Sequence, residues 1–256
     1  MTFAHSDEQR MLAETLDGAL SGGDPATWND AVQGPGLDAL GIPEASGGIG
    51  TDLRDAAVVA AAFGRANAGL PWAEHWTATK LGAPDLDGPR AACEAEALRF
   101  ANDETQRAEA RDDIALLHAA EMVGLCRTML GDTAAYLKQR HQFGVPIASF
   151  QVLRHRVADM AMALEHAEAL VDLAIDAAPS SRPLLISAAR VVADESGRIV
   201  GEGAVQLHGA MGLTAELRLG GYFRRLRMLM QDDGTAAAHV RRYAALSSTP
   251  RAIRSR

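Results

Sequence analysis

The sequence has 256 residues, 48% of them hydrophobic, and a formal net charge of −8 at pH 7. A chain of this length can bury a substantial core as one large domain or as two smaller ones. The negative charge argues against general nucleic-acid binding, and the longest apolar runs are far shorter than the ~18 residues that suggest a membrane span. Because no basic and apolar leader precedes "MTFAHSDEQR", we expect a cytoplasmic protein.

The charge is unevenly distributed along the chain. Residues 1–113 carry a net charge of −12, whereas residues 114–256 carry +4. An anionic cofactor is therefore expected in the C-terminal half. The two cysteines, Cys93 and Cys126, lack CxxC spacing, so we expect no disulfide framework and no metal site, and we expect both thiols to be buried.

The N-terminal part of the chain predicts two helices. One starts at Ser6, where acidic residues occupy the first turn and apolar residues recur through "MLAETLDGAL". After a glycine-rich loop, a helix of small apolar residues is expected from Leu53 to Arg65, and it is apolar enough to require packing inside a bundle. Residues 1–82 are therefore expected to form an N-terminal helical domain.

Residues 83–111 are acidic, rich in alanine and interrupted by Pro and Gly. They predict a linker with one strand or short helix, and residues 95–101 are the most strand-like stretch. Residues 112–256 predict a helical bundle domain, because apolar residues recur at intervals of four and three between Leu153 and Val171. That stripe and its neighbours present more apolar surface than one small bundle covers, so we expect an oligomer.

The stretch from Gln206 to Thr235, "QLHGAMGLTAELRLGGYFRRLRMLMQDDGT", is unusual for a helix. It contains five glycines and an arginine cluster. Each glycine inside a helix costs roughly 1 kcal/mol relative to alanine, so five of them indicate that the backbone closely approaches another group, which the glycines alone do not identify.

Four stretches, taken in order, resemble the acyl-CoA dehydrogenase family of flavoproteins. The resemblance covers residues 1–80 and 112–246, and it rests on "SDEQRMLAETL", "GIPEASGGIGTDLRDAAVVAAAFGRA", "YLKQRHQFGVPIASFQVLRHRVADM" and "QLHGAMGLTAELRLGGYFRRL". In that family a helical domain, a central β domain and a C-terminal four-helix domain hold FAD. A β barrel needs about 50 to 70 residues, more than the 29 of residues 83–111. The resemblance therefore implies an all-α chain whose central β domain is missing or vestigial.

The resemblance also implies which residues contact FAD. In the family, an "RxxFG" turn and a "QxHGGxG" segment of a neighbouring subunit meet the pyrophosphate and adenosine. These residue types can bind a pyrophosphate. A guanidinium donates two parallel hydrogen bonds to a phosphate, and glycines let backbone N–H groups approach an anion. Carried over, the cofactor-binding roles fall on Arg140, Gln142, Phe143, Gln151, Gln206, Gly209, Ala210 and Thr235.

Structural alternatives stand beside these roles. Arg140 could instead be a cation at a helix C-terminus, with Phe143 in the core. His155 and His208 are expected to be structural, since the family's chemistry uses no histidine there. We expect Arg225 and Arg227 to lie on a solvated face.

The catalytic residue implied by the resemblance is Asp233. Family members remove the α-proton of the thioester with a glutamate in an "EGT" turn, while hydride leaves the β carbon for the flavin. Here the turn is "QDDGT", and its shorter carboxylate could alternatively be the N-cap of a last helix from Thr235 to Leu246. Ala115 occupies the position of an arginine that helps to bind acyl-CoA in the family.

Three functions follow from these features. The first is an acyl-CoA dehydrogenase subunit that shares its flavin site with a full-length partner. Another is a self-sufficient homo-oligomeric dehydrogenase that uses Asp233 as its base. The third is a flavin-free helical protein, either a structural or regulatory partner or a repurposed non-redox enzyme.

Overall fold

The computed structural model describes residues 3–20, 37, 40, 42, 48–83, 90–209, 218–231 and 236–248. Within these residues the chain is helical apart from a single two-stranded hairpin, so the expected all-α fold without a substantial β domain is confirmed. The elements are α1 (Asp7–Leu20), α3 (Leu53–Ala66), α4 (Trp72–Lys80), α5 (Arg90–Arg99), α6 (Glu104–Gln139), β1 (His141–Gln142), β2 (Val145–Pro146), η3 (Ile147–Ser149), α7 (Gln151–Ile175), α8 (Arg182–His208), α9 (Leu219–Leu229) and α10 (Ala236–Ser248).

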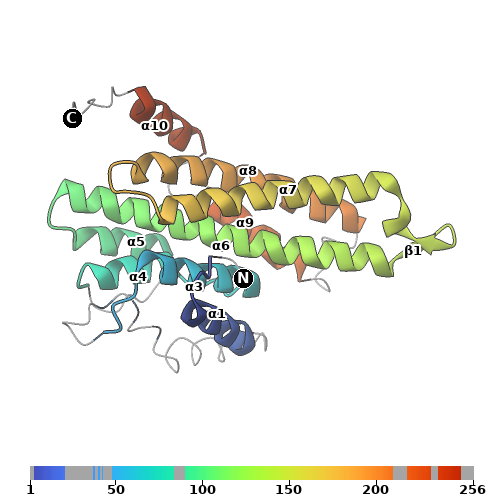
Figure 1. Cartoon of the computed structure of the whole chain (residues 1–256), viewed down its shortest axis with the longest axis horizontal. Coiled ribbons are helices and arrows are strands. Elements are labelled where there is room, and N and C mark those ends of the chain that lie inside the picture. Colours follow the sequence, from blue (N-terminus) through green and yellow to red (C-terminus); the bar gives the residue numbers. More distant parts are fainter. Residues whose placement is uncertain are drawn as a thin grey trace.

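The long helices α6, α7 and α8 form the body of the molecule and pack against one another (Figure 1). The predicted stripe of α7 faces this bundle, and its Met160, Leu164, Ala167 and Val171 are buried. Since the chain covers most of the stripe itself, the stripe is not the apolar surface that an oligomer would bury. The stripe alone therefore does not account for the expected oligomer.

Helix α6 is the central core helix, with 36 residues. One 18-residue window of α6 is long and apolar enough to cross a membrane, but 78% of that window is buried inside the fold. A helix that is apolar on all sides belongs to a protein core as readily as to a bilayer. Cys126 of α6 is buried as expected, and burial raises the pKa of its thiol to about 12.

Helices α3 and α6 cross at two glycines. A Cβ atom on Gly64 would lie 2.1 Å from the carbonyl oxygen of Glu121, and one on Gly124 would lie 2.1 Å from that of Ala61. Real Cβ atoms do not approach backbone oxygen so closely, so only glycine allows the two backbones to touch. The N-terminal helix α3 is thereby packed directly on the bundle.

Gly124→Ala is expected to lower the free energy of unfolding by about 1–3 kcal/mol, because the two helices must move apart. Helix propensity alone would raise the free energy of unfolding by about 1 kcal/mol, because alanine favours a helix over glycine. A decrease in the free energy of unfolding would therefore report the loss of packing. Gly131→Ala is the matched control, since its Cβ would lie in open space on the same helix. Denaturant titration of both variants measures the difference, and equal stability in the two would contradict the close crossing.

The region between the two halves is helical. Helix α5 spans Arg90–Arg99, so the strand suggested for residues 95–101 is wrong. Alanine, glutamate, leucine and arginine dominate this segment, and all of them favour helices. The buried residues Cys93 and Ala97 are one helical turn apart. Helix α6 begins at Glu104, where the Asp103 side chain accepts a hydrogen bond from the Gln106 backbone N–H, so part of the expected linker belongs to the core helix.

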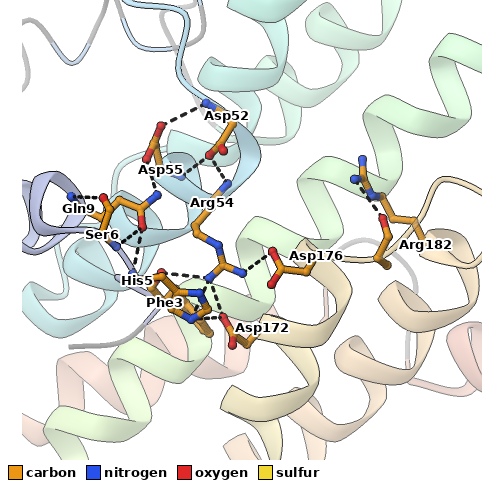
Figure 2. A network of polar contacts seen from close by, with 11 residues as sticks. Phe3, His5, Ser6, Gln9, Asp52, Arg54, Asp55, Asp172, Asp176 and Arg182 are labelled. Atoms are coloured by element: carbon orange, nitrogen blue, oxygen red, sulfur yellow. Dashed lines mark hydrogen bonds and ion pairs between the residues drawn. The ribbon is translucent and has the colours of Figure 1, made fainter.

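Arg54 ties the N-terminal segment and α3 to the end of α7, as Figure 2 shows. Its side chain pairs with Asp172 at 2.7 Å and with Asp176 at 2.6 Å, and it donates a hydrogen bond to the Phe3 carbonyl at 3.1 Å. Burial alone lowers the pKa of this guanidinium, but the two carboxylates outweigh it, so the pKa is raised. The network fixes the N-terminal part of the chain against the bundle.

Candidate functional site

The first motif predicted to bind FAD forms a hairpin at one end of the bundle. Between β1 and β2, Phe143 and Gly144 have φ angles of 53° and 80°. Two successive residues with positive φ define a type I′ turn, a tight turn that joins two antiparallel strands. For phenylalanine this left-handed conformation costs about 1–3 kcal/mol.

The aromatic ring at this turn is left in solvent. Phe143 is 91% exposed and touches the rest of the chain through an edge-to-face contact with Phe150. It is therefore not a core residue, which was the structural alternative. A strained turn that holds an exposed ring points to a contact outside this chain. In Figure 1 the hairpin extends beyond the ends of α6 and α7.

Arg140 is the C-cap residue of α6, and its backbone N–H donates to the Tyr136 carbonyl at 2.8 Å. Its side chain is exposed, and within the described residues no carboxylate pairs with its guanidinium. Gln142 and Gln151 are likewise exposed beside it. This position suits both the phosphate-binding role and the role of a cation near a helix C-terminus.

The second motif lies at the same end of the bundle. His208, near the end of α8, stacks on Tyr136 of α6 with ring centroids 4.4 Å apart. Its Nδ1–H donates to the Ala204 carbonyl at 2.9 Å. The histidine is buried and thus has the structural role expected of it. The stacking brings the ends of α6 and α8 together, and with them the two predicted motifs.

Gly209 ends α8 with φ 63° and ψ −146°, a conformation that is essentially restricted to glycine. Gln206, three residues earlier in α8, is exposed. Gly209 thus leaves its backbone accessible at the end of the bundle that carries Arg140. Ala210, Asp233 and Thr235 lie outside the described residues, so the remaining predicted site residues have no structural account.

A cavity of about 470 Å³ lies between α5, α6 and α10. Ala115, at the position where an acyl-CoA arginine was expected, forms part of its wall together with Asp112, His239 and Arg242. Its volume falls in the range of roughly 300–1,000 Å³ that is typical of small-molecule sites. The cavity lies along the first part of α6, far from the hairpin at the other end of that helix.

A second cavity, of about 610 Å³, adjoins the network of Figure 2 and is lined by Arg54, Asp176 and Arg182. On its other side Lys80 pairs with Asp113 at 2.6 Å. Burial raises the pKa of the Asp113 carboxyl, while the nearby Lys80 acts in the opposite direction. Paired opposite charges dominate this wall, which indicates two structural ties, one between α4 and α6 and one between α3 and the end of α7.

The expectation of a solvated Arg225 is wrong. Its side chain is buried, and its Nε and Nη2 atoms donate to the two carboxylate oxygens of Glu121 at 2.6 and 3.0 Å. The physical reason is the period of α9: Tyr222, Arg225 and Leu229 share its inner face. Arg227 lies on the exposed face, as expected.

Another buried pair was not anticipated from the sequence. Glu74 of α4 and His118 of α6 lie 3.0 Å apart, and both side chains are 1% exposed. Neither residue stands out from its neighbours in the sequence. The signal that could have found the pair is the position of a histidine and a glutamate among otherwise apolar, core-facing residues.

Comparison with known proteins identifies the class. The profile of the acyl-CoA dehydrogenase C-terminal domain matches residues 112–246. The chain is 31% identical to the acyl-CoA dehydrogenase IpdE2 of Mycolicibacterium smegmatis, over 95% of this chain and 96% of that protein. IpdE2 of Mycobacterium tuberculosis is 30% identical over 86% of this chain and 91% of its own length. The chain therefore belongs to the acyl-CoA dehydrogenase family.

Solved structures show the same fold. The structure of the ChsE4-ChsE5 complex from Mycobacterium tuberculosis has a chain that matches 98% of this one over 100% of its own length, with a TM-score of 0.82 and 17% identity. A chain of the Tcur3481-Tcur3483 steroid acyl-CoA dehydrogenase matches with a TM-score of 0.80 and 18% identity. Butyryl-CoA dehydrogenase from Megasphaera elsdenii matches over only 37% of its length, with a TM-score of 0.52. The fold thus agrees with short members of the family over their whole length.

Proposed function

We propose that this chain is one subunit of a hetero-oligomeric acyl-CoA dehydrogenase of the cytoplasm and shares its FAD site with a longer partner subunit. The assembly would carry out α,β-dehydrogenation of an acyl-CoA thioester. The observation that carries the proposal is the strained, exposed Arg140–Phe143 hairpin beside the Gly209 helix end. Family membership supplies the reaction class.

The length of α6 supports a shared site. Ala115 in the cavity wall and Arg140 at the hairpin are 25 residues apart on one helix. At 1.5 Å per residue, this places them about 37 Å apart. A hairpin so far from the cavity of its own chain is better placed to serve a site that another subunit completes. The two short structural neighbours support this reading, because their descriptions name complexes of two proteins.

The described residues fit one end of an anionic dinucleotide. Arg140 would fork onto a phosphate, Gly209 would offer its backbone, and Phe143 would cover an apolar part of the cofactor. Gln142, Gln151, Gln206, Ala210 and Thr235 are proposed to complete the polar contacts. When bound, FAD supplies the hydride acceptor. Asp233 is proposed to take up the α-proton of the substrate, with the N-cap role as the alternative.

The substrate class is proposed to be a bulky acyl-CoA. One structural neighbour is described as a steroid acyl-CoA dehydrogenase. A turnover assay of the reconstituted complex with short-chain and steroid-chain acyl-CoA thioesters distinguishes the substrate classes.

Arg140→Ala is expected to weaken FAD retention by the complex about ten- to 150-fold, since a charge-assisted contact of this kind contributes about 1.5–3 kcal/mol. Lys138→Ala is the matched control, because Lys138 is also a cation in the last turn of α6. Measuring the ratio of flavin to protein after dialysis separates the roles. If both variants keep their flavin equally well, Arg140 acts only on the helix terminus. A parent complex without flavin would favour the flavin-free alternative.

A further inference from the structure

The cavity lined by Ala115 also contains an arginine side chain from another helix in its wall. Arg242 of α10 and Arg111 of α6 both contribute to its wall. Arg111 pairs at 3.2 Å with Glu104 of its own helix, and both side chains are largely exposed. Helix α10 packs mainly on α8, so the Arg242 side chain reaches across to α6. Arg242 is therefore the arginine that the fold directs over this cavity.

The position of the Arg242 guanidinium is fixed. Its two terminal nitrogens contact both carboxylate oxygens of Asp112, with Nη2 2.8 Å from Oδ2. Asp112 precedes Ala115 by three residues and so lies on the same face of α6. The guanidinium consequently lies over the face of the helix on which the family arginine is missing.

The pair is asymmetric in its exposure. The Asp112 side chain is 9% exposed, whereas that of Arg242 is 36% exposed. A guanidinium has five N–H donors, and the bidentate contact with Asp112 uses two of them. Among the described residues no other partner takes the remaining donors, so they are available to an anion in the cavity, while the buried carboxylate orients the guanidinium.

We propose that Arg242 replaces the missing arginine at Ala115 and binds a phosphate of the coenzyme A moiety in this cavity. This inference rests on the proposed function, since it assigns the binding of the same substrate. Asp112 acts as the positioning residue for Arg242. The arginine that binds the phosphate thus comes from α10 instead of α6, but it lies at the same cavity.

The test is titration of coenzyme A into the purified full-length chain by calorimetry, with no partner present to add a second site. Arg242→Gln is expected to weaken binding about ten- to 150-fold. Arg241→Gln, the adjacent exposed arginine, is the charge-matched control and should leave the affinity unchanged. Adding Ala115→Arg to the Arg242→Gln variant should restore binding, because it returns a guanidinium to the cavity.

Asp112→Asn separates ligand binding from a purely structural tie. If Arg242 binds phosphate, this variant keeps at least the parent affinity, because the guanidinium remains and a neighbouring negative charge is gone. Equal loss of affinity in Asp112→Asn and Arg242→Gln would show that the pair only holds α10 in place and would overturn the proposal. So would parent-like affinity in Arg242→Gln or a parent chain that does not bind coenzyme A. Flavin content of the reconstituted complex tests the proposed function separately.

Discussion

Arg225→Leu is expected to lower the free energy of unfolding by about 3–5 kcal/mol, because it leaves the Glu121 carboxylate buried without its partner. Arg225 is only 8% exposed and Glu121 only 5%. Burial by itself lowers the pKa of Arg225, and Glu121 outweighs this effect, so the pKa is raised. Arg225 also donates to the Leu70 carbonyl at 3.3 Å and thereby links α9 to the segment before α4. Denaturant titration measures the loss.

Two further variants make this prediction specific. Arg227→Leu removes an exposed arginine from the same helix and should change stability by no more than about 0.5 kcal/mol. Combining Glu121→Leu with Arg225→Leu should recover much of the loss, since an apolar pair needs no desolvation of charge. If Arg225→Leu and Arg227→Leu were equally stable, the ion pair would not be buried.

Asp233→Asn is expected to reduce turnover of an acyl-CoA by the reconstituted complex by roughly 10²-fold or more. Asparagine keeps the size of aspartate and caps helices about equally well, so stability should change by less than ~1 kcal/mol. The substitution removes only the proton acceptor. Rapid mixing of substrate with the oxidised complex, followed through flavin absorbance, measures the step directly.

The alternative role of Asp233 gives the opposite pattern. If the side chain is only an N-cap, Asp233→Asn leaves turnover nearly intact and Asp233→Ala lowers the melting temperature through the loss of about 0.5–2 kcal/mol. Asp232→Asn is the neighbouring control and should have parent-like turnover under either role. Unchanged flavin reduction in Asp233→Asn would remove this residue from the active site.

The sequence predicted those helices whose apolar period is regular. The stripe through Met160 and Leu164 specified α7, and the end of α3 at Ala66 lies within one residue of the expected Arg65. Residues 95–101 misled because seven residues are too few for the apolar period to separate a helix from a strand, although their residue types favour a helix. The expectation for Arg225 was wrong because it rested on the charge of the side chain. The spacing of Arg225 from Tyr222 places it on the inner face of α9.

The resemblance proposes the site residues one by one, but it does not give their arrangement in space. The resemblance assigns Arg140 and Gly209 to one cofactor, yet only the stacking of Tyr136 on His208 brings their two helix ends together. The type I′ turn at Phe143 could not be foreseen, because phenylalanine is unfavourable in its left-handed conformation. The role proposed for Arg242 could not be predicted from its local sequence, since it depends on the carboxylate of Asp112, which lies 130 residues away along the chain.

The uninterrupted course of α6 has a consequence for how the family's members can diverge. Its first part lines the cavity and its last residue precedes the hairpin, so one rigid rod sets both the spacing and the relative direction of the two. Inserting a single residue between them would lengthen the rod by 1.5 Å and rotate the hairpin by about 100° relative to the cavity. A partner that engages both regions could not follow such a rotation. If the proposed partner subunit engages both regions, α6 between Ala115 and Arg140 therefore keeps its length.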